Sequence, residues 1–341
     1  MNASAAHEVD LLALLRLAAR APSSHNTQPW IFRVDGRTID VIADRTRALP
    51  VNDAYDRELT MSCACALMNL RVAAAAQRLH LECLPLPDPV DEDCLARVTV
   101  TGMSPGPVAE AALLPAIEGR RTFRARFEAR PVPDEAIAAM TAAAGLEGAA
   151  LRPLVEAAAR ERVAALVAEG DAVLWANPAW RRELSAWMHP RRRGDGLTVP
   201  ALALPLAQMV VRTFDMGGGV AAHDKELADA SPLLAVLTTE GDDVRSWLRA
   251  GQALQRVLLV ACGYGLQASY LNQPIQVAAL RPKLRQLAGG GMPQILLRIG
   301  HAGREVPPSA RRPLEDVVEI VNGSQAVLPA SAVTSSISIG P

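Results

Sequence analysis

Apolar residues recur along this chain at helical spacing in the long segments and as continuous runs in the short ones. Leucines at 11, 12, 14, 15 and 17 give the segment from about Glu8 to Arg20 one apolar face, which predicts a helix. Pro22 disfavours helical geometry at the residue before it and ends this helix. Two strands are predicted at Trp30–Val34 and Thr38–Ala43, because Asp35-Gly36 between them is a strong hairpin signal.

Two long apolar helices are predicted further along, at about 56–79 and 242–266. Segments 66–80 (ALMNLRVAAAAQRLH) and 253–267 (ALQRVLLVACGYGLQ) within them align without a gap, which indicates a faint internal repeat. The other expected elements are strands at 81–87 and 96–102, helices at about 109–118, 131–145 and 154–169, and buried strands at 232–239 and 293–300.

Segments rich in proline and glycine suggest where the chain divides into parts. The stretch SPGPV at 104–108 is the best candidate linker, separating an N-terminal half (1–104) from a C-terminal half (105–341). Residues 177–219 are expected to form an irregular, lid-like excursion that ends in a flexible glycine run. Residues 322–341 are rich in serine and alanine, and we expect a flexible tail or a wrapping arm.

Composition and charge exclude several classes of partner. Half of the 341 residues are hydrophobic, and 35 basic residues nearly balance 36 acidic ones, so nothing favours binding to nucleic acid or to an anionic membrane. No apolar run reaches about 18 residues and no secretory signal is visible, which indicates no membrane span. An odd number of cysteines without a CxxC pair favours a reducing, cytoplasmic location.

Two cysteines, Cys63 and Cys65, suggest a metal clip at first sight. They lie in a helical run, however, where residues two apart point away from each other, and no histidine cluster accompanies them. We therefore interpret them as buried structural residues and predict no metal site.

The segment APSSHNTQPW (21–30) carries more hydrogen-bonding groups than a turn requires. Neutral hydroxyl and amide groups suit the edge of a heterocyclic ring with alternating C=O and N–H groups. A helix end followed by an Asx or Ser turn explains Ser23, Ser24 and Asn26, but not the following Gln28-Pro29-Trp30. A serine nucleophile activated by His25 is disfavoured, because adjacent residues rarely reach that geometry and no elbow motif is present.

Arginines cluster in two later segments. Four of them, at 120, 121, 124 and 126, surround Thr122, and Arg311 and Arg312 lie near the other end of the second half. Guanidinium groups match phosphate oxygens, and a threonine hydroxyl adds a donor. A solvated basic turn is the simpler interpretation of residues 120–126 taken alone.

These segments together resemble the nitroreductase superfamily. The stretch AARAPSSHNTQPWIF resembles its flavin-binding loop, and GRRTFRARFEARPVPDEAI resembles its RRS-x-R start, with one residue inserted before Phe127. YGLQASYLNQP resembles its segment beside the flavin, and RIGHAGREVPPSARRPLEDVV its Arg-Arg-Pro ending. The layout is most similar to the Acg-like branch, in which two nitroreductase-like halves are fused in one chain.

The resemblance implies an α+β nitroreductase-like fold, an internal pseudo-dimer of two central-sheet halves flanked by helices, that is monomeric or forms a further homodimer. It implies one FMN for each chain, because the loop and the arginines each occur once, in different halves. The cofactor-binding residues that it implies are Pro22, Ser23, Ser24, His25, Asn26, Thr27, Gln28, Arg120, Arg121, Thr122, Arg124, Ser309, Arg311 and Arg312. Gln28 is expected mainly to hold the shape of the loop.

The activity that the resemblance implies is an FMN-dependent oxidoreductase. NAD(P)H, bound transiently, would supply a hydride to flavin N5, and a nitroaromatic or quinone-like small molecule would accept the electrons. This chemistry requires no proton-transferring side chain, so no catalytic residue is predicted. The alternative is an FMN storage protein with little turnover, in which the excursion at 177–219 covers the flavin.

Overall fold

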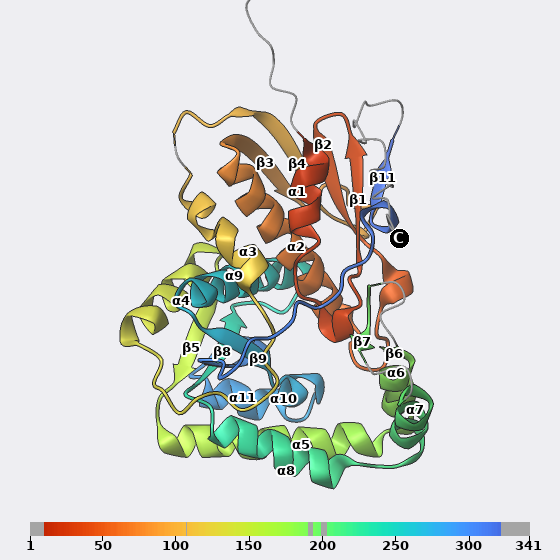
Figure 1. The fold of residues 1–341 in the computed structure, drawn as a ribbon, viewed down its shortest axis with the longest axis vertical. Helices are drawn as coiled ribbons and strands as arrows, with labels where there is room; N and C mark the ends of the chain where they lie inside the picture. The colour runs from red at the N-terminus through yellow and green to blue at the C-terminus, as the bar shows by residue number, and fades with distance from the viewer. Residues whose placement is uncertain (1–9, 107, 190–193, 199–202, 322–341) are drawn as a thin grey trace, which may run out of the picture.

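Two β-sheets form the centre of the molecule, and each belongs largely to one half of the chain (Figure 1). The computed structural model describes residues 10–106, 108–189, 194–198 and 203–321. The first sheet has the strand order β11 (Val318–Ile320), β1 (Trp30–Asp35), β2 (Thr38–Ala43), β4 (Cys94–Met103) and β3 (Leu79–Pro85). The second has the order β5 (Ala150–Leu154), β8 (Leu233–Thr239), β10 (Met292–Gly300) and β9 (Gln267–Tyr270). The expected α+β class with two sheets is confirmed.

One strand of the first sheet comes from the far end of the chain. β11 pairs in parallel with β1, with Val318 opposite Phe32. Residues 301–317 therefore run from the end of β10 in the second sheet to the edge of the first, along the blue trace in Figure 1. We call residues 301–317 the crossing strap. It brings residues near position 311 to the same region as the loop that precedes β1.

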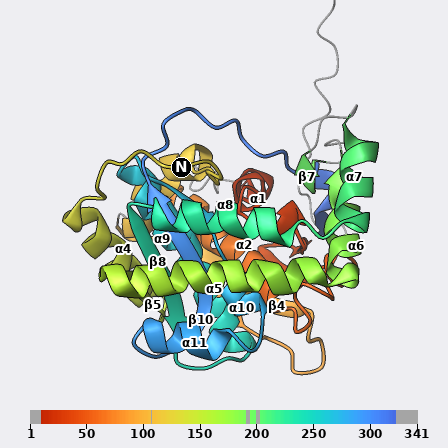
Figure 2. The same ribbon diagram turned by 90° about the horizontal axis from the view of Figure 1, so that it is seen from below.

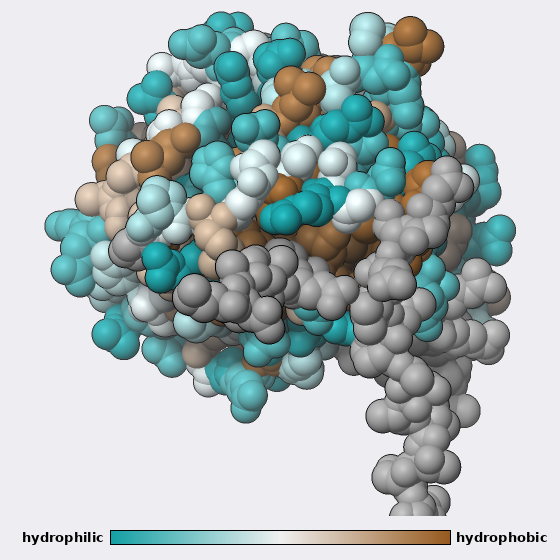
Figure 3. Space-filling model, turned by 90° about the horizontal axis from the view of Figure 1, so that it is seen from above, coloured by the Kyte–Doolittle hydropathy of each residue, from teal (hydrophilic) through white to brown (hydrophobic). Residues whose placement is uncertain are grey.

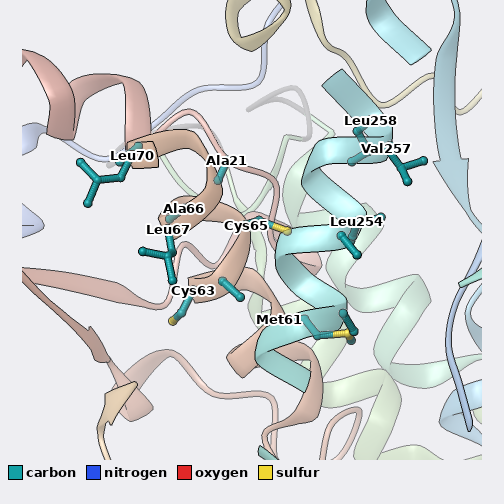
Figure 4. Close-up of a cluster of buried hydrophobic side chains, with 14 of the residues drawn as sticks. Ala21, Met61, Cys63, Cys65, Ala66, Leu67, Leu70, Leu254, Val257 and Leu258 are labelled. Atoms are coloured by element: carbon teal, nitrogen blue, oxygen red, sulfur yellow. The ribbon is translucent and has the colours of Figure 1, made fainter. Parts of the chain in front are cut away.

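Helices α2 (Arg57–Ala76) and α9 (Val244–Gly263) pack against each other between the sheets. These helices contain the two repeated segments, and they approach most closely at Gly251, where a Cβ would lie 2.3 Å from the carbonyl oxygen of Met61. In Figure 4, Met61 and Cys65 point toward α9, whereas Leu67 and Leu70 point to the other side. A buried hydrogen bond of 2.6 Å from Gln255 Nε2 to Asn69 Oδ1 fixes the relative position of the helices.

Burial explains the composition of α2. By length and hydropathy (mean 1.4) this helix is apolar enough to cross a membrane, but 89% of that window is buried inside the protein. A helix that is apolar all round is typical of a protein core as well as of a membrane span. Cys63 and Cys65 are buried in it and donate to the carbonyl oxygens of Pro29 (3.0 Å) and Gly251 (3.2 Å). Their structural interpretation is confirmed.

Two further layers of helices cover the sheets. α5 (Ala157–Ala176) and α8 (Gly217–Asp229) lie side by side across the lower face, with α6 (Pro178–Ala186) and α7 (Leu204–Thr213) at one end (Figure 2). The others are α1 (Leu11–Ala18), α3 (Leu114–Gly119), α4 (Asp134–Leu146), α10 (Gln273–Gln276) and α11 (Arg281–Leu287). Seen from above, hydrophilic side chains cover much of the surface, with hydrophobic ones between them (Figure 3).

The prediction of an irregular excursion at 177–219 was wrong, because much of it is helical. Asn177 caps α6 by accepting a hydrogen bond from the backbone N–H of Ala179 (2.9 Å), and Pro178 occupies the first helical position, where proline is favourable. The glycine run at 217–219 is the first turn of α8 rather than a flexible stretch. A Cβ on Gly217 would lie 3.0 Å from that of Trp175, so the lack of a side chain permits close packing. The short strands β6 (Met188–His189) and β7 (Leu197–Thr198) also lie in this segment.

Smaller differences concern element boundaries. The helix expected from residue 154 begins at Ala157, because residues 150–154 form the edge strand β5, which sequence reasoning missed. The helix expected at 109–118 is a 3-10 helix at Ala109–Leu113 followed by α3. The hairpin at Asp35-Gly36 is confirmed, with Gly36 at φ +56°. The proposed start at Glu8 and the tail at 322–341 lie outside the described residues.

We predict that Gly251→Ala lowers the free energy of unfolding by about 1–3 kcal/mol or more, because the added methyl group forces α2 and α9 apart. Urea denaturation measures the loss. Gly263→Ala in the same helix is the matched control, since no atom lies within 4 Å of a Cβ built there. Equal stability of the two variants would contradict the close packing at Gly251.

Candidate functional site

A cavity lies where residues from both halves of the chain meet. It encloses about 710 Å³ of space when the open solvent at its mouth is included. The N-terminal half contributes Pro22, Ser23, Ser24, His25, Asn26, Glu58, Met61, Ser62 and Cys65 to its wall. The C-terminal half contributes Arg120, Thr122, Arg124, Leu254, Tyr270, Asn272, Ile295, Ser309 and Arg311. The structure thus brings together ten of the fourteen residues that the sequence singled out.

The loop between α1 and β1 has an unusual backbone conformation. Three non-glycine residues of this loop have a positive φ angle: His25 (49°), Asn26 (55°) and Gln28 (52°). Each costs roughly 1–3 kcal/mol, and such conformations persist only where the surroundings enforce them. Ser23 Oγ accepts a hydrogen bond from the backbone N–H of Gln28 at 2.9 Å and closes the loop.

Contacts from distant segments enforce this conformation. Asn26 Nδ2 donates to the carbonyl oxygen of Ala310 at 3.3 Å, and its Oδ1 accepts from Arg311 Nη1 at 3.2 Å. Gln28 Nε2 donates to the carbonyl oxygen of Gly194 at 2.8 Å. Gly194 has φ +73°, and a Cβ there would lie 1.8 Å from the carbonyl oxygen of Arg311, so this position requires glycine. The loop, the crossing strap and the segment at 194–196 therefore form one interlocked unit.

Four predicted residues lie behind the cavity wall rather than on it. Thr27 and Gln28 are buried, and Gln28 Oε1 accepts from the backbone N–H of Arg312 at 2.9 Å. The Arg312 side chain donates to the carbonyl oxygen of Gln28 at 3.0 Å and lies 3.6 Å from Asp44. Arg121 donates to the carbonyl oxygens of Val306 (3.0 Å) and Arg120 (2.9 Å). These contacts support the wall, and direct cofactor contact by the four residues stays a prediction.

One end of the cavity is strongly cationic. Arg120 is buried and, among the described residues, forms no ion pair; its Nε and that of Arg311 are buried without a hydrogen-bond partner. Arg311 otherwise donates to backbone carbonyls, those of Arg20 (2.9 Å) and Ala21 (3.0 Å) among them. Burial, together with the neighbouring arginines, lowers the pKa of Arg311 to about 9, and burial also lowers the pKa of Arg120. Guanidinium groups that have a buried Nε without a partner and no neutralising acid indicate a site for an anion.

A smaller hollow adjoins this cationic end. Arg120, Thr122, Ser309 and Arg311 line both spaces, and Arg20 and Arg121 line only the smaller one. Two hydroxyl groups therefore lie beside the unpaired guanidinium groups.

The cavity wall also contains a carboxylate that sequence reasoning missed. Glu58, in the first turn of α2, accepts a hydrogen bond of 2.5 Å from Ser24 Oγ. Met61, Ser62, Cys65, Leu254 and Ile295 were also missed, because they lie on core elements whose apolar pattern shows only burial. Tyr270 and Asn272 fall within YGLQASYLNQP, the segment that resembles the family, although they were not predicted individually.

His25 faces this cavity as a neutral imidazole. Its Nδ1 is buried without a hydrogen-bond partner. Burial lowers its pKa to about 4; Glu58 opposes this shift, and Arg124 adds to it. Among the described residues, no group of three or more histidine, cysteine, aspartate or glutamate side chains is arranged to hold a metal ion.

Comparison with known proteins decides the family. The sequence matches no family model. It is 36% identical over 315 residues to "Putative NAD(P)H nitroreductase Rv3131" of Mycobacterium tuberculosis, a match that covers 90% of each chain. The chain belongs to the nitroreductase family. A second protein of that organism with the same designation, acg, is 28% identical over 313 residues, covering 90% of this chain and 94% of the other. The resemblance to the Acg-like branch of the nitroreductases is confirmed.

Comparison with solved structures gives matches of low overall similarity to nitroreductases. The FMN- and NADPH-dependent nitroreductase NfnB of a Sphingopyxis strain (HMH) has a TM-score of 0.40 at 19% identity, covering 61% of this chain and 97% of the other. An FMN-bound nitroreductase of Bacteroides fragilis has a TM-score of 0.37 at 13% identity, covering 57% of this nitroreductase-family chain and 91% of the other. Membership of the family rests on the sequence comparison.

We predict that His25→Gln reduces the acid sensitivity of this nitroreductase-family protein. Between pH 6.5 and about 4, the histidine binds a proton in the unfolded chain but not in the folded one. The free energy of unfolding therefore decreases as the pH is lowered, by up to about 1.4 kcal/mol per pH unit. Urea denaturation at pH 7 and at pH 4.5 measures the difference. His80→Gln, at an exposed position, is the control and should keep the wild-type dependence. An unchanged dependence in His25→Gln would contradict the burial of a neutral imidazole.

Proposed function

We propose that the cavity binds flavin mononucleotide and that the protein is an NAD(P)H-dependent oxidoreductase for nitroaromatic or quinone-like small molecules. The observation that carries the proposal is the pair Arg120 and Arg311, whose Nε atoms are buried without a hydrogen-bond partner and which form no ion pair among the described residues. Membership of the nitroreductase family supports it, as does the name of the M. tuberculosis relative, an NAD(P)H nitroreductase.

The cationic end of the cavity fits a phosphate group. A guanidinium presents several N–H donors in a planar fork, and charge-assisted bonds to phosphate oxygens are about twice as strong as neutral ones. Thr122 and Ser309 offer hydroxyl groups on the same wall. A phosphate would supply the acceptors that the two buried Nε groups lack. We infer that Arg120, Arg311, Thr122 and Ser309 hold the phosphate.

The remainder of the wall fits a flat heterocycle with a polar edge. Met61, Leu254 and Ile295 provide apolar surface, and Ser23, Ser24 and Asn26 provide neutral polar groups. Cofactor sites commonly combine such apolar walls with a few placed polar groups. The strained loop fixes its polar groups before binding, which lowers the entropy cost of recognition.

When bound, the flavin supplies the hydride chemistry at N5, and the protein supplies binding, orientation and electrostatics. Arg124, at the solvent-accessible part of the wall, offers positive charge for the negative charge that the ring gains on reduction. The neutral imidazole of His25 adds no charge of its own to the site. No side chain is assigned a proton transfer.

The helical excursion allows turnover rather than storage in this proposal. Its segment at 194–196 contacts the loop from outside, through Gly194 and Gly196, and no described residue of 177–219 lines the cavity. This absence among the described residues supports turnover, in which a donor and an acceptor would reach the wall one after the other.

The purified protein should be yellow, and anaerobic addition of NADPH or NADH should bleach its flavin absorbance within seconds. Stopped-flow absorbance in the visible range follows the reaction. Flavin that stays oxidised for minutes would favour the storage function instead. A colourless protein that cannot be reconstituted with FMN would exclude both functions.

Arg120→Ala should weaken FMN binding about tenfold or more, because a charge-assisted hydrogen bond contributes roughly 1.5–3 kcal/mol. Its affinity for riboflavin, which lacks the phosphate, should remain close to that of the wild type. Fluorescence quenching of each flavin measures both affinities. Arg126→Ala is the matched control, since this exposed arginine pairs with Glu226 at the surface. An equal loss for FMN and riboflavin would mean that Arg120 does not hold the phosphate.

A further inference from the structure

Glu58 is the one acidic residue among the described residues that line the cavity. It is 4% exposed, so its carboxylate lies in a largely dry environment, where a charge acts strongly on its neighbours. Neither its position in an apolar helix nor the resemblance to the family singled it out. It is a buried acidic residue in a cavity wall that also contains three arginines, Arg120, Arg124 and Arg311.

Three donors hold the carboxylate in place. Ser24 Oγ donates to Glu58 Oε2 at 2.5 Å, and Gln276 Nε2 and Arg57 Nη2 donate to Oε1 at 3.0 and 3.2 Å. Glu58 also lies in the first turn of α2, where the helix dipole favours negative charge. These contacts come from the loop, from α10 and from its own helix, so the carboxylate has one defined position.

In the ion pair between Glu58 and Arg57, the two residues line different hollows. Glu58 lines the cavity, whereas Arg57 lines a separate hollow on the other side and donates to the backbone oxygen of Gln294 at 2.6 Å. The negative member of the pair is therefore the one that faces the cavity. Arg120 and Arg311 are assigned to the phosphate and do not neutralise this carboxylate.

We propose that the charge of Glu58 lowers the reduction potential of the bound flavin; this inference rests on the proposed function. Two-electron reduction adds two electrons and one or two protons, and the ring becomes anionic when it takes up only one proton. A fixed negative charge in the same cavity disfavours that electron-rich state. Glu58 is thus a positioning residue for redox tuning rather than a catalytic one, and Ser24 is the contact that ties it to the flavin-binding loop.

The test compares Glu58→Gln with Glu58→Asp in the FMN-loaded protein. Glu58→Gln removes the charge and should raise the ratio of reduced-flavin to oxidised-flavin affinity about tenfold, a rise in midpoint potential of about 30 mV for a two-electron couple. Glu58→Asp keeps the charge and should stay close to the wild type. Thr60→Ala, also on α2 but outside the cavity wall, is the matched control, because its hydroxyl donates to the backbone oxygen of Asp56 and not to the carboxylate. Spectroelectrochemical titration measures each potential.

The outcomes separate tuning from structure. If Glu58 had a purely structural role, its substitution would weaken the binding of oxidised and reduced flavin equally and leave the midpoint potential unchanged. Glu58→Gln that retains FMN at the wild-type potential would overturn the inference, and so would equal shifts in Glu58→Gln and Glu58→Asp. If Glu58→Gln does not fold, Glu58→Ala removes the same charge: a raised potential supports the inference, and a wild-type potential overturns it. A wild-type protein that binds no FMN would instead refute the proposed function.

Discussion

The packing of α2 against α9 positions every other part of the candidate site. The two helices meet at Gly251, where the backbone of one lies almost against that of the other, and the buried bond between Asn69 and Gln255 fixes their register. α2 carries four residues of the cavity wall and α9 carries one, so a change in their separation would open or close the cavity. α1 packs on α2 and delivers the loop at 22–28 to the mouth of the same cavity.

The site is formed at a cost in local backbone energy that long-range contacts offset. The three left-handed residues of the loop are stabilised by the crossing strap and by Gly194 and Gly196, which come from parts of the chain more than 160 residues away. Arg311 contacts the loop through Asn26 and also donates to the backbone oxygens of Arg20 and Ala21, and it forms no ion pair among the described residues. Strain in the loop and unpaired charge on the arginines thus have one structural origin.

The sequence was sufficient for the features that depend on local pattern. The apolar periodicity of the two long helices, the hairpin at Asp35-Gly36 and the paired loop and arginine segments each predicted an element or a cluster that the structure contains. The features that it did not reveal depend on tertiary contact. β5 is a short edge strand that exists because β8 pairs with it. The glycine run at 217–219 begins a helix, and at Gly217 the contacts with Trp175 and Asp215 leave little room for a side chain. Glu58 lines the cavity only because α2 packs beside the loop. This contact joins residues that are far apart in sequence, so the sequence pattern could not predict it.

The distribution of charge gives the cavity a direction. Ser24 donates to Glu58, and Arg311 donates to backbone oxygens, so the acid and this arginine do not pair with each other. In the proposed complex, Arg120 and Arg311 would hold the phosphate, and the ring would lie nearer Glu58 and His25. The loop joins both ends, because Ser24 contacts Glu58 and Asn26, two residues later, contacts Arg311. Phosphate binding beside Arg311 would therefore stabilise the same strained loop that positions Ser24 against the Glu58 carboxylate. In the proposed complex, the affinity for the cofactor and the electrostatic environment of its ring would depend on the same loop.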